Sequence, residues 1–493
     1  MSTRESVEVK RSVPVVSEVD VLVVGSGIAG STAAVTAARE GARTMVVDRF
    51  GYPGGNMGPG LIGGAPNLEL PDSMAKNGLP GIPGEFVRRC EEYCNARLLN
   101  HYFRDSHVIS YVWLKMMQES GVQLMFNSYA ADPIMEKNRI VGLLVENKSG
   151  AQAIRAKVVI DATGDADVAF RAGAPVDNGS SLFHAGLYFA MANVDVERYE
   201  EEVLQREPEA EDLRWAESIF ESIFGRRWLS EHLKPLVPYY RKAWESGEYK
   251  FIQNIDNRWS ILCDHGIFRS VSGVQYVPDP LRKGRYGILG ALVGVWGPKD
   301  GKDVETSGSA SVMNKLEVAS RIYIFETAQF LRKYVPGFEE SYLHFVAPYF
   351  HARGGRSIVS EYSLTMKDVE EERRHDDVIF VATKPELKNR LTGEQVWGYH
   401  AIKTFDFPYR QLLPRKVEGL LAAGRSAIIQ PPVTRVRWMV FLMGQAAGAA
   451  AALAVKRDVV PRELNVKELQ SLLYNKYQVP LGGKKRLREI GII

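Results

Sequence analysis

The residues best suited to chemistry in this chain are three glycines near the N-terminus, Gly25, Gly27 and Gly30, in the sequence GSGIAG. Glycines at this spacing permit a tight turn, let a pyrophosphate approach the backbone, and let the following helix pack closely on a strand. The unpaired N–H groups and partial positive charge at the start of that helix attract phosphate. Since GxGxxG alone is a weak signal, its surroundings decide its meaning.

The segments around these glycines complete a nucleotide-binding unit. EVDVLVV, at 18–24, is a short β-branched apolar run typical of a buried parallel strand. STAAVTAAREG follows the turn and indicates a helix that ends at Gly41. RTMVVD predicts a second strand ending at Asp48, about 20 residues beyond the turn, where a carboxylate can accept hydrogen bonds from a ribose diol. This order predicts a site for an adenine dinucleotide.

The rest of the chain favours FAD over NAD. The stretch PGGNMGPGLIGG, at 53–64, follows the second strand closely and places two of its glycines beside the same dinucleotide. Residues 122–167 predict a return strand, a β-meander and a central strand, and VEGLLAAGRSAI, at 417–428, predicts a further strand before a small-residue helix. The sequence holds no second strand–GxGxxG–helix unit and no CxxC pair. A separate NAD(P)H domain with a redox disulfide is therefore not expected.

Taken together, these motifs resemble those of FAD-dependent oxidoreductases related to fumarate reductase flavoproteins and to the flavin core of heterodisulfide reductase. The resemblance covers residues 18–455. It rests on VVGSGIAG, DRFGYPGGN, VVIDATGDADVA, FLRKYVPGFEESYL, FPYRQLLP, and LLAAGRSA with MGQAAGAAAALA.

The resemblance implies an α/β fold, with a Rossmann-like FAD-binding domain of the glutathione reductase/fumarate reductase type and an inserted α+β substrate or cap domain. The expected FAD-binding domain is discontinuous and comprises 18–177 and 405–456. The insert is 178–404, and 457–493 form a C-terminal helical tail. Within the insert, 307–335 predict one long helix begun by serines and ended before Pro336.

The resemblance also implies where FAD lies. The glycine turn and helix start would face the pyrophosphate, Asp48 and Arg49 the adenosine side, and Gly55 and Asn56 the pyrophosphate and ribityl chain. The later motifs would close over the adenosine and approach the flavin. The expected FAD contacts are Gly25, Gly27, Ile28, Ala29, Gly30, Asp48, Arg49, Gly55, Asn56, Thr163, Gly164, Asp165, Gly424, Arg425 and Arg435.

Candidate catalytic residues lie mainly in YFHARGGRSIVSEYSLT, at 349–365. Arg353 and Arg356 match arginines of the family, and the guanidinium fork suits a carboxylate substrate. A structural ion pair and a contact with FAD are the alternatives for both. His351 and Tyr409 are candidates for moving a proton near flavin N5, because they lie in matching motifs and titrate; packing is the alternative for each.

The sequence departs from the family pattern at two places. Gly354 and Gly355 stand where a glutamate and a serine are expected. In VTRVRWMVF, Arg437 and Trp438 replace the usual methionine and proline, which would put a cation and an indole at the edge of the flavin. A substrate carried over from a relative is therefore not assigned.

Composition excludes several other functions. A net charge of +3 gives no electrostatic footprint for nucleic acid. Three cysteines cannot ligate an iron–sulfur cluster of the usual kind, and neither a spaced metal-ligand cluster nor a GxSxG elbow is present, so no metal site is expected.

The polar N-terminus lacks the apolar core of a signal peptide, and two apolar segments are interrupted or short, which favours a cytoplasmic protein without a membrane span.

The sequence thus predicts an enzyme that uses FAD to transfer a hydride between flavin N5 and a small polar or anionic organic substrate. Two alternatives stay open. One is a flavin monooxygenase that uses NAD(P)H and oxygen, and the other is the flavin-binding component of an electron-transfer complex whose iron–sulfur clusters lie on a separate redox partner. Homo-oligomerisation is left open by the sequence.

Overall fold

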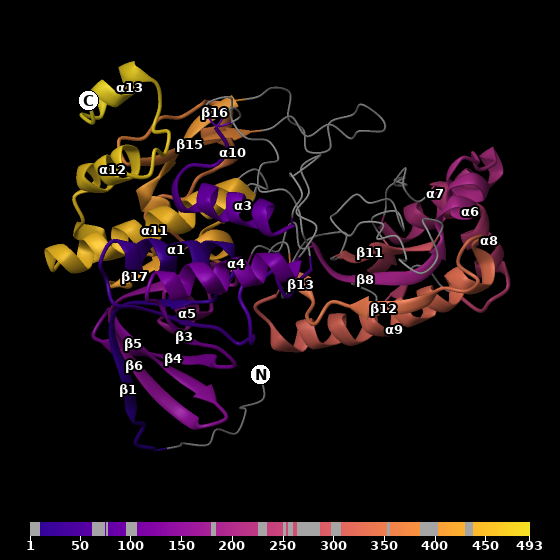
Figure 1. Ribbon diagram of the computed structural model, residues 1–493, viewed down its shortest axis with the longest axis horizontal. Coiled ribbons are helices and arrows are strands. Elements are labelled where there is room, and N and C mark those ends of the chain that lie inside the picture. The colour runs from indigo at the N-terminus through magenta and orange to yellow at the C-terminus, as the bar shows by residue number, and fades with distance from the viewer. Residues whose placement is uncertain are drawn as a thin grey trace.

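The computed structural model describes 10–61, 74, 77–94, 106–178, 184–224, 234–249, 253–254, 260–263, 286–296, 307–352, 355–384, 403–428 and 437–493. These residues form two lobes, each with its own sheet and its own core (Figure 1). The first core gathers buried side chains from Val19 to Ala174 and from Ile358 to Ile490. The second gathers side chains from Ala185 to Ala352.

A seven-stranded sheet forms the first lobe. Its strand order is β3-β2-β1-β6-β5-β4, with β17 paired to β6. The strands β1 (Val15–Val24), β2 (Thr44–Val47), β3 (Gln123–Met125), β6 (Gly150–Asp161) and β17 (Leu420–Ala422) run parallel. The antiparallel strands β4 (Tyr129–Glu136) and β5 (Arg139–Asn147) complete the predicted meander. The predicted strand order along the chain is confirmed.

Two helices with small side chains pack together beside this sheet. They are α1 (Ile28–Arg39) and α11 (Arg437–Arg457). A Cβ atom on Gly444 or Gly448 would overlap the backbone of Ala29 or Ala33, so glycine is what allows α11 to approach α1 so closely. Of the described helices, α11 alone is long and apolar enough to cross a membrane, and 89% of that apolar window is buried inside the protein. This burial is that of a core helix.

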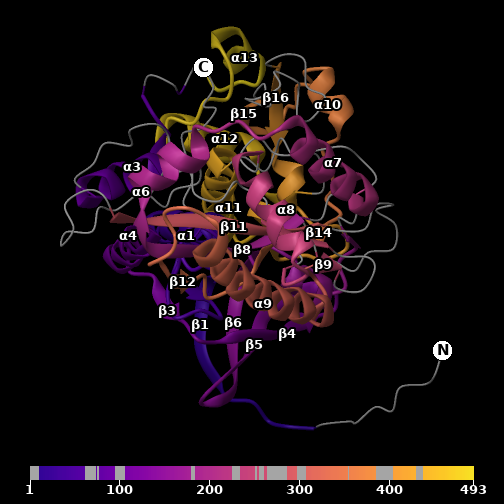
Figure 2. The ribbon, with the colours of Figure 1, turned by 90° about the vertical axis from the view of Figure 1, so that its right-hand side faces the viewer.

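The second lobe is built on an antiparallel sheet. Its strands are β8 (His184–Asp195), β9 (Gln253–Asn254), β10 (Ser260–Cys263), β11 (Tyr286–Trp296), β12 (Tyr342–Val346) and β13 (His351–Ala352). The predicted long helix is α9 (Ala310–Tyr334), and the Ser309 hydroxyl caps it by accepting a hydrogen bond from Val312 N. Figure 2 shows α9 crossing this lobe, with α7 (Ala210–Phe224) and α8 (Val237–Glu245) above it.

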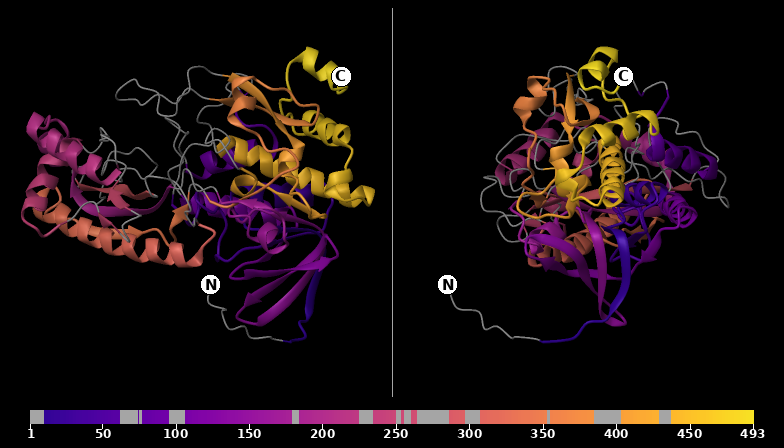
Figure 3. Two further views of the ribbon diagram at one scale, coloured as in Figure 1. Left: turned by 180° about the vertical axis from the view of Figure 1, so that it is seen from behind. Right: turned by 90° about the vertical axis from the view of Figure 1, so that its left-hand side faces the viewer.

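Residues 355–384 pack on the first core, although the expected domain boundary at 404 would place them in the insert. Strand β15 (Val378–Lys384) pairs with β16 (Lys403–Pro408), and Val378 and Phe380 belong to the first core. The expected boundary cuts this hairpin, because nothing in the local sequence marks where the chain returns to the first core. The C-terminal helices α12 (Val466–Asn475) and α13 (Lys484–Glu489) also pack on that core, on the side away from the second lobe (Figure 3).

A buried carboxylate in β1 makes the stability of the first lobe depend on pH. Asp20 accepts hydrogen bonds from the backbone N–H and side chain of Arg43 and pairs with Lys157 at 3.1 Å. The hydrogen bond from the Arg43 side chain is the main cause that lowers the pKa of Asp20 from 3.8 to about 2. The folded carboxylate therefore adds stability above the unfolded pKa, and this stability is lost as the pH falls through about 2.

We expect Asp20→Asn to lower the free energy of unfolding at pH 7 by about 1 kcal/mol, because both cationic partners are more than half exposed and solvent screens them. Urea unfolding at pH 7 and near pH 2 measures the effect, which should vanish at the lower pH. Asp132→Asn is the control, since Asp132 is 68% exposed and lies 3.9 Å from Arg171. An equal loss in both variants would contradict the assignment.

Candidate cofactor and substrate site

The glycine turn at the end of β1 forms a backbone cradle. Gly25 has φ +95° and donates its N–H to Val47 O at 2.8 Å. A Cβ on Gly25 would lie 2.5 Å from Ala162 O, so this glycine serves close packing. Gly27 precedes α1 and faces Gly55 across the turn, where a Cβ on Gly55 would lie 2.8 Å from Gly27 Cα. The first turn of α1 holds no acidic side chain that would compete with a phosphate.

Asp48 ties the second strand to the glycine turn. Its Oδ2 accepts hydrogen bonds from the backbone N–H of Ser26 at 2.5 Å and from the Ser26 hydroxyl at 2.6 Å. Its Oδ1 accepts one from Phe50 N at 2.8 Å. A carboxylate offers about four acceptor positions, so one position on Oδ1 stays available for a ribose hydroxyl. The predicted ribose contact is compatible with this geometry and stays a prediction.

A second polar loop follows β6 at the same edge of the sheet. The buried carboxylate of Asp161 accepts hydrogen bonds from Thr163 N, the Thr163 hydroxyl, Ala169 N and the Ser426 hydroxyl, at 2.7–3.1 Å. The Ser426 hydroxyl accepts hydrogen bonds from Gly164 N and Ala166 N. Burial raises the pKa of Asp161, and these donors oppose the shift. Asp161 therefore holds the 163–166 loop and the turn after β17 in one arrangement.

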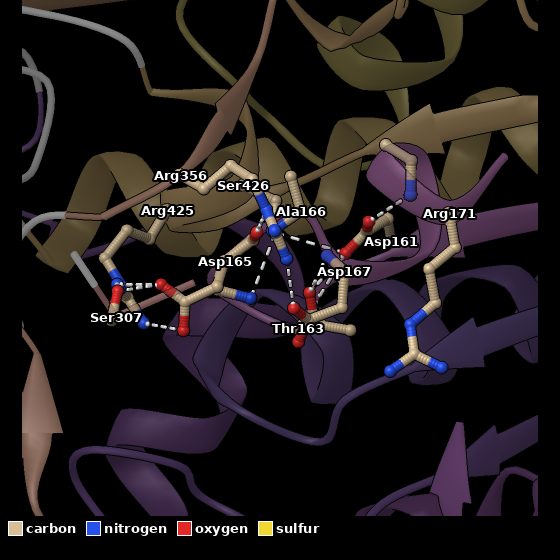
Figure 4. A network of polar contacts seen from close by, with 12 residues as sticks. Asp161, Thr163, Asp165, Ala166, Asp167, Arg171, Ser307, Arg356, Arg425 and Ser426 are labelled. Atoms are coloured by element: carbon tan, nitrogen blue, oxygen red, sulfur yellow. Dashed lines mark hydrogen bonds and ion pairs between the residues drawn. The ribbon is translucent and has the colours of Figure 1, made fainter. Parts of the chain in front are cut away.

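Arg425 and Asp165 form the centre of a network that joins the two lobes (Figure 4). Arg425 donates to both carboxylate oxygens of Asp165, at 2.7 and 3.0 Å. Ser307, which precedes α9, donates its hydroxyl to the same carboxylate. Gly164 has φ +89°, a conformation that L side chains rarely adopt, which explains the glycine at this position. The network joins the β6 loop and the turn after β17 to the start of α9.

Arg356 belongs to this network. Its Nε donates to Asp165 O at 2.8 Å, its Nη2 pairs with Asp167 at 2.6 Å, and its guanidinium lies 4.1 Å from the Phe170 ring centroid. Burial raises the pKa of Asp167, as do the nearby carboxylates, while Arg356 opposes the shift. Because the Arg356 side chain is 91% buried and its guanidinium is paired, we assign Arg356 the structural ion pair that the sequence left open as an alternative.

The other predicted catalytic residues have different surroundings. His351 lies in β13, opposite Gly186 of β8, and is 1% exposed. Tyr409 is also 1% exposed, and its hydroxyl donates to Pro461 O at 2.8 Å inside the first core. Since the only hydroxyl of Tyr409 donates to Pro461 O, we assign this residue a packing role, the alternative to catalysis. Arg353, like the expected FAD contact Arg435, lies outside the described residues.

The remaining expected FAD contacts divide by exposure. Along the carboxyl ends of the parallel strands, a half-buried strip is accessible to a ligand, whereas Ala29, Gly30 and Gly424 are buried and serve packing. The strip comprises Gly25, Gly27, Ile28, Gly55, Asn56, Thr163, Gly164, Asp165 and Arg425, with Arg49 exposed beside it. Ligands of open α/β sheets bind at this edge. The glycine cradle and the half-buried strip of polar groups therefore fit a dinucleotide.

Trp438 does not lie where the sequence suggested. Its side chain is fully buried, and its ring packs edge-on against Phe380 with centroids 6.1 Å apart. The indole at this position fills the core between α11 and β15, so it is not available to shape a substrate pocket. Arg437, the first residue of α11, is half-buried.

Sequence reasoning missed Asp161, Ser307, Tyr349 and Ser426. Asp161 ends an apolar strand run in the same way as Asp48 does, and this parallel was a usable signal. Ser307 and Tyr349 had no local signal, because their partners lie 142 and 293 residues away.

The strand–turn–helix unit, the half-buried strip and the second polar loop are typical of a dinucleotide-binding fold. The profile of the family described as FAD dependent oxidoreductase matches residues 20–473. The chain belongs to this family, so it is an enzyme and its cofactor is FAD. The narrower resemblance to fumarate reductase flavoproteins and heterodisulfide reductase stays a prediction.

Several solved structures are distantly similar to this chain. No curated protein sequence matches the chain. A geranylgeranyl bacteriochlorophyll reductase-like protein from Thermoplasma acidophilum is 13% identical with a TM-score of 0.42, over 94% of this chain and 84% of that one. A flavoprotein/dehydrogenase from Cytophaga hutchinsonii is 13% identical with a TM-score of 0.40, over 93% and 86%. A p-nitrophenol 4-monooxygenase from Pseudomonas putida is 10% identical with a TM-score of 0.36, over 97% and 84%.

Proposed function

We propose that this enzyme transfers a hydride between flavin N5 and a small polar or anionic organic substrate held between the two lobes. The observation that carries the proposal is the position of β13. Asn56, which follows the glycine cradle, donates its Nδ2 to Ala352 O at 3.4 Å, and Ala352 adjoins His351. A titratable imidazole from the second lobe is thereby brought close to the segment predicted to hold FAD.

Each part of the chain has a role in this proposal. FAD, when bound, supplies the two-electron acceptor or donor. The cradle at Gly27 and Gly55 binds and orients it, and the second lobe covers the site and excludes water. His351 would exchange the accompanying proton through an imidazole nitrogen, since an imidazole can act as a general acid or base. Arg353 is the remaining arginine proposed to bind an anionic group of the substrate.

The first experiment is an absorbance scan of the purified protein, followed by anaerobic reduction. We expect flavin bands near about 450 nm, bleached by substrate or by NAD(P)H and restored by an artificial electron acceptor. A protein that oxidises NAD(P)H rapidly with matching oxygen uptake would be a monooxygenase instead. Turnover that requires a co-purifying iron–sulfur protein would identify one component of an electron-transfer complex. Among the described residues, no group of three or more His, Cys, Asp or Glu side chains could hold a metal ion.

A further inference from the structure

The glycine-rich segment 53–61 connects the cores of both lobes. Met57 is fully buried in the first core, and Leu61 packs against the second. Backbone hydrogen bonds fold the segment onto itself: Met57 N donates to Gly54 O at 3.1 Å, and Leu61 N donates to Gly58 O at 2.9 Å. Leu61 has φ +54°, which is uncommon for a branched residue and requires support from its surroundings. The segment therefore has a defined conformation held by its own hydrogen bonds and by both cores, and it is not a flexible linker.

One end of this connection is fixed to the cradle. Gly54 N donates to Ser26 O at 2.8 Å, beside the Asp48 contacts, and Gly55 faces Gly27. Ser110, in α4 (Ser106–Glu119), donates its hydroxyl to Pro53 O at 2.7 Å and holds the segment from the other side. Any movement of the turn beside the dinucleotide strip would therefore move Asn56.

Within the segment, Asn56 is fixed to the second lobe on both sides of His351. Tyr349 donates its hydroxyl to Asn56 Oδ1, and Asn56 Nδ2 donates to Ala352 O. Between these two partners lies His351, in the strand that pairs with β8. One amide side chain thus holds the short segment that carries the proposed proton-transfer residue.

Tyr349 is supported by residues that follow Asp48. Its ring centroid lies 4.6 Å from that of Phe50, and the Arg49 guanidinium lies 5.6 Å from it. Burial raises the pKa of Tyr349, and the Arg49 charge opposes the shift, so the hydroxyl stays a neutral donor at physiological pH. The tyrosine therefore contacts two parts of the predicted cofactor site, the segment after β2 and, through Asn56, the end of the glycine cradle.

We propose that 53–61 and Tyr349 form a joint through which FAD binding sets the position of β13, with Asn56 and Tyr349 as positioning residues for His351. The proposal rests on the predicted placement of Gly55 against FAD, and it does not depend on which reaction follows. A ligand that fixes Gly55 fixes Asn56, and Asn56 holds the Tyr349 hydroxyl and the Ala352 carbonyl, which lie on either side of His351. The network at Asp165 holds the lobes together elsewhere, so the joint acts locally on β13.

Hydrogen exchange followed by mass spectrometry, with and without FAD, tests this joint. In the wild-type protein, FAD should slow exchange both in the turn 53–61 and in 342–352, the latter on the order of fivefold, the lower end of ordinary coupling between sites. Tyr349→Phe keeps the ring and loses only the hydroxyl, and Asn56→Ala loses both hydrogen bonds. In both variants the FAD-dependent slowing of 342–352 should fall below about twofold, while FAD still protects 25–30.

Tyr342→Phe is the matched control, because Tyr342 is 55% exposed on nearby β12 and, among the described residues, its hydroxyl is not a hydrogen-bond partner of Asn56. A purely structural role for Tyr349 would loosen β13 equally with and without FAD and leave the FAD effect intact, which would overturn the joint. An exchange rate in 342–352 of the wild-type protein that is the same with and without FAD would also overturn the joint. So would protection of 342–352 by FAD without protection of 53–61. None of these results bears on hydride transfer, which the reduction experiment tests separately.

Discussion

Gly55→Val is expected to yield a folded protein that retains little or no FAD. Gly55 has φ +53°, a conformation that costs an L-residue roughly 1–2 kcal/mol, and β-branched residues tolerate it poorly. The larger effect is steric. The new Cβ would lie 2.8 Å from Gly27 Cα, so the two backbones of the cradle must separate. We expect a loss of FAD affinity of at least about 100-fold, equal to some 2.7 kcal/mol.

The measurement is the ratio of flavin absorbance to protein absorbance after purification, with a melting curve for each protein. Gly121→Val is the matched control, because Gly121 also has positive φ, at +73°, and a Cβ there meets no heavy atom within 4 Å. The control shares the conformational strain without the steric conflict, so it should lose stability and keep FAD. Equal FAD content in the two variants would show that the glycine stretch is only a connection between lobes.

The first lobe could be predicted from the sequence because its signals are local. Strand, turn and helix follow one another within 18–48, and the β-meander is joined by tight turns. The periodicity of the hydrophobic residues, the spacing of the glycines and an acidic residue at the end of the strand are enough to place such elements. The same reasoning placed the serine cap of α9 and its end before Pro336, because capping also depends on neighbours in the sequence.

Contacts between residues that lie far apart in the sequence could not be predicted in this way. Arg425 and Asp165 are 260 residues apart, and Tyr349 and Asn56 are 293 apart. Nothing in the sequence near Arg356 distinguishes an arginine that binds substrate from one that pairs with Asp167, because both need the same guanidinium fork. Trp438 illustrates the same limit, since an indole at a helix start suits either a ligand pocket or the core position that it occupies beside Phe380.

Asp161 shows how much of the site depends on a residue that need not touch the ligand. Its carboxylate is fully buried and accepts hydrogen bonds from two backbone N–H groups and two hydroxyls. Two of the donors belong to Thr163, one to the start of α5 (Asp167–Arg171), and one to Ser426. Because Ser426 in turn holds Gly164 N, the carboxylate fixes the relative position of two loops that are adjacent only in the folded protein.

Asp161→Ala should therefore be among the most damaging single substitutions in the first lobe. It leaves four donors without their acceptor, two of them buried and two partly buried, and we expect a loss of about 3–5 kcal/mol in the free energy of unfolding. Asp161→Asn keeps one oxygen for Thr163 and Ser426 but turns an NH2 group toward Ala169 N, so its loss should be intermediate. Denaturant unfolding and FAD content measure both effects, with Asp132→Ala, an exposed carboxylate of β4, as the control.

The two readouts separate the possible roles of Asp161. If it only supports the fold, FAD content should follow stability, and Asp161→Asn, with its partial acceptor, should keep FAD in proportion. If it positions the 163–165 loop and Arg425 for the cofactor, FAD affinity should fall more steeply than stability, because a small rotation of the loop displaces Gly164, Asp165 and Arg425 together. We expect the second result. A loss of less than about 1 kcal/mol in Asp161→Ala would mean that water replaces the carboxylate, and that the loops are held mainly by the Asp165 network.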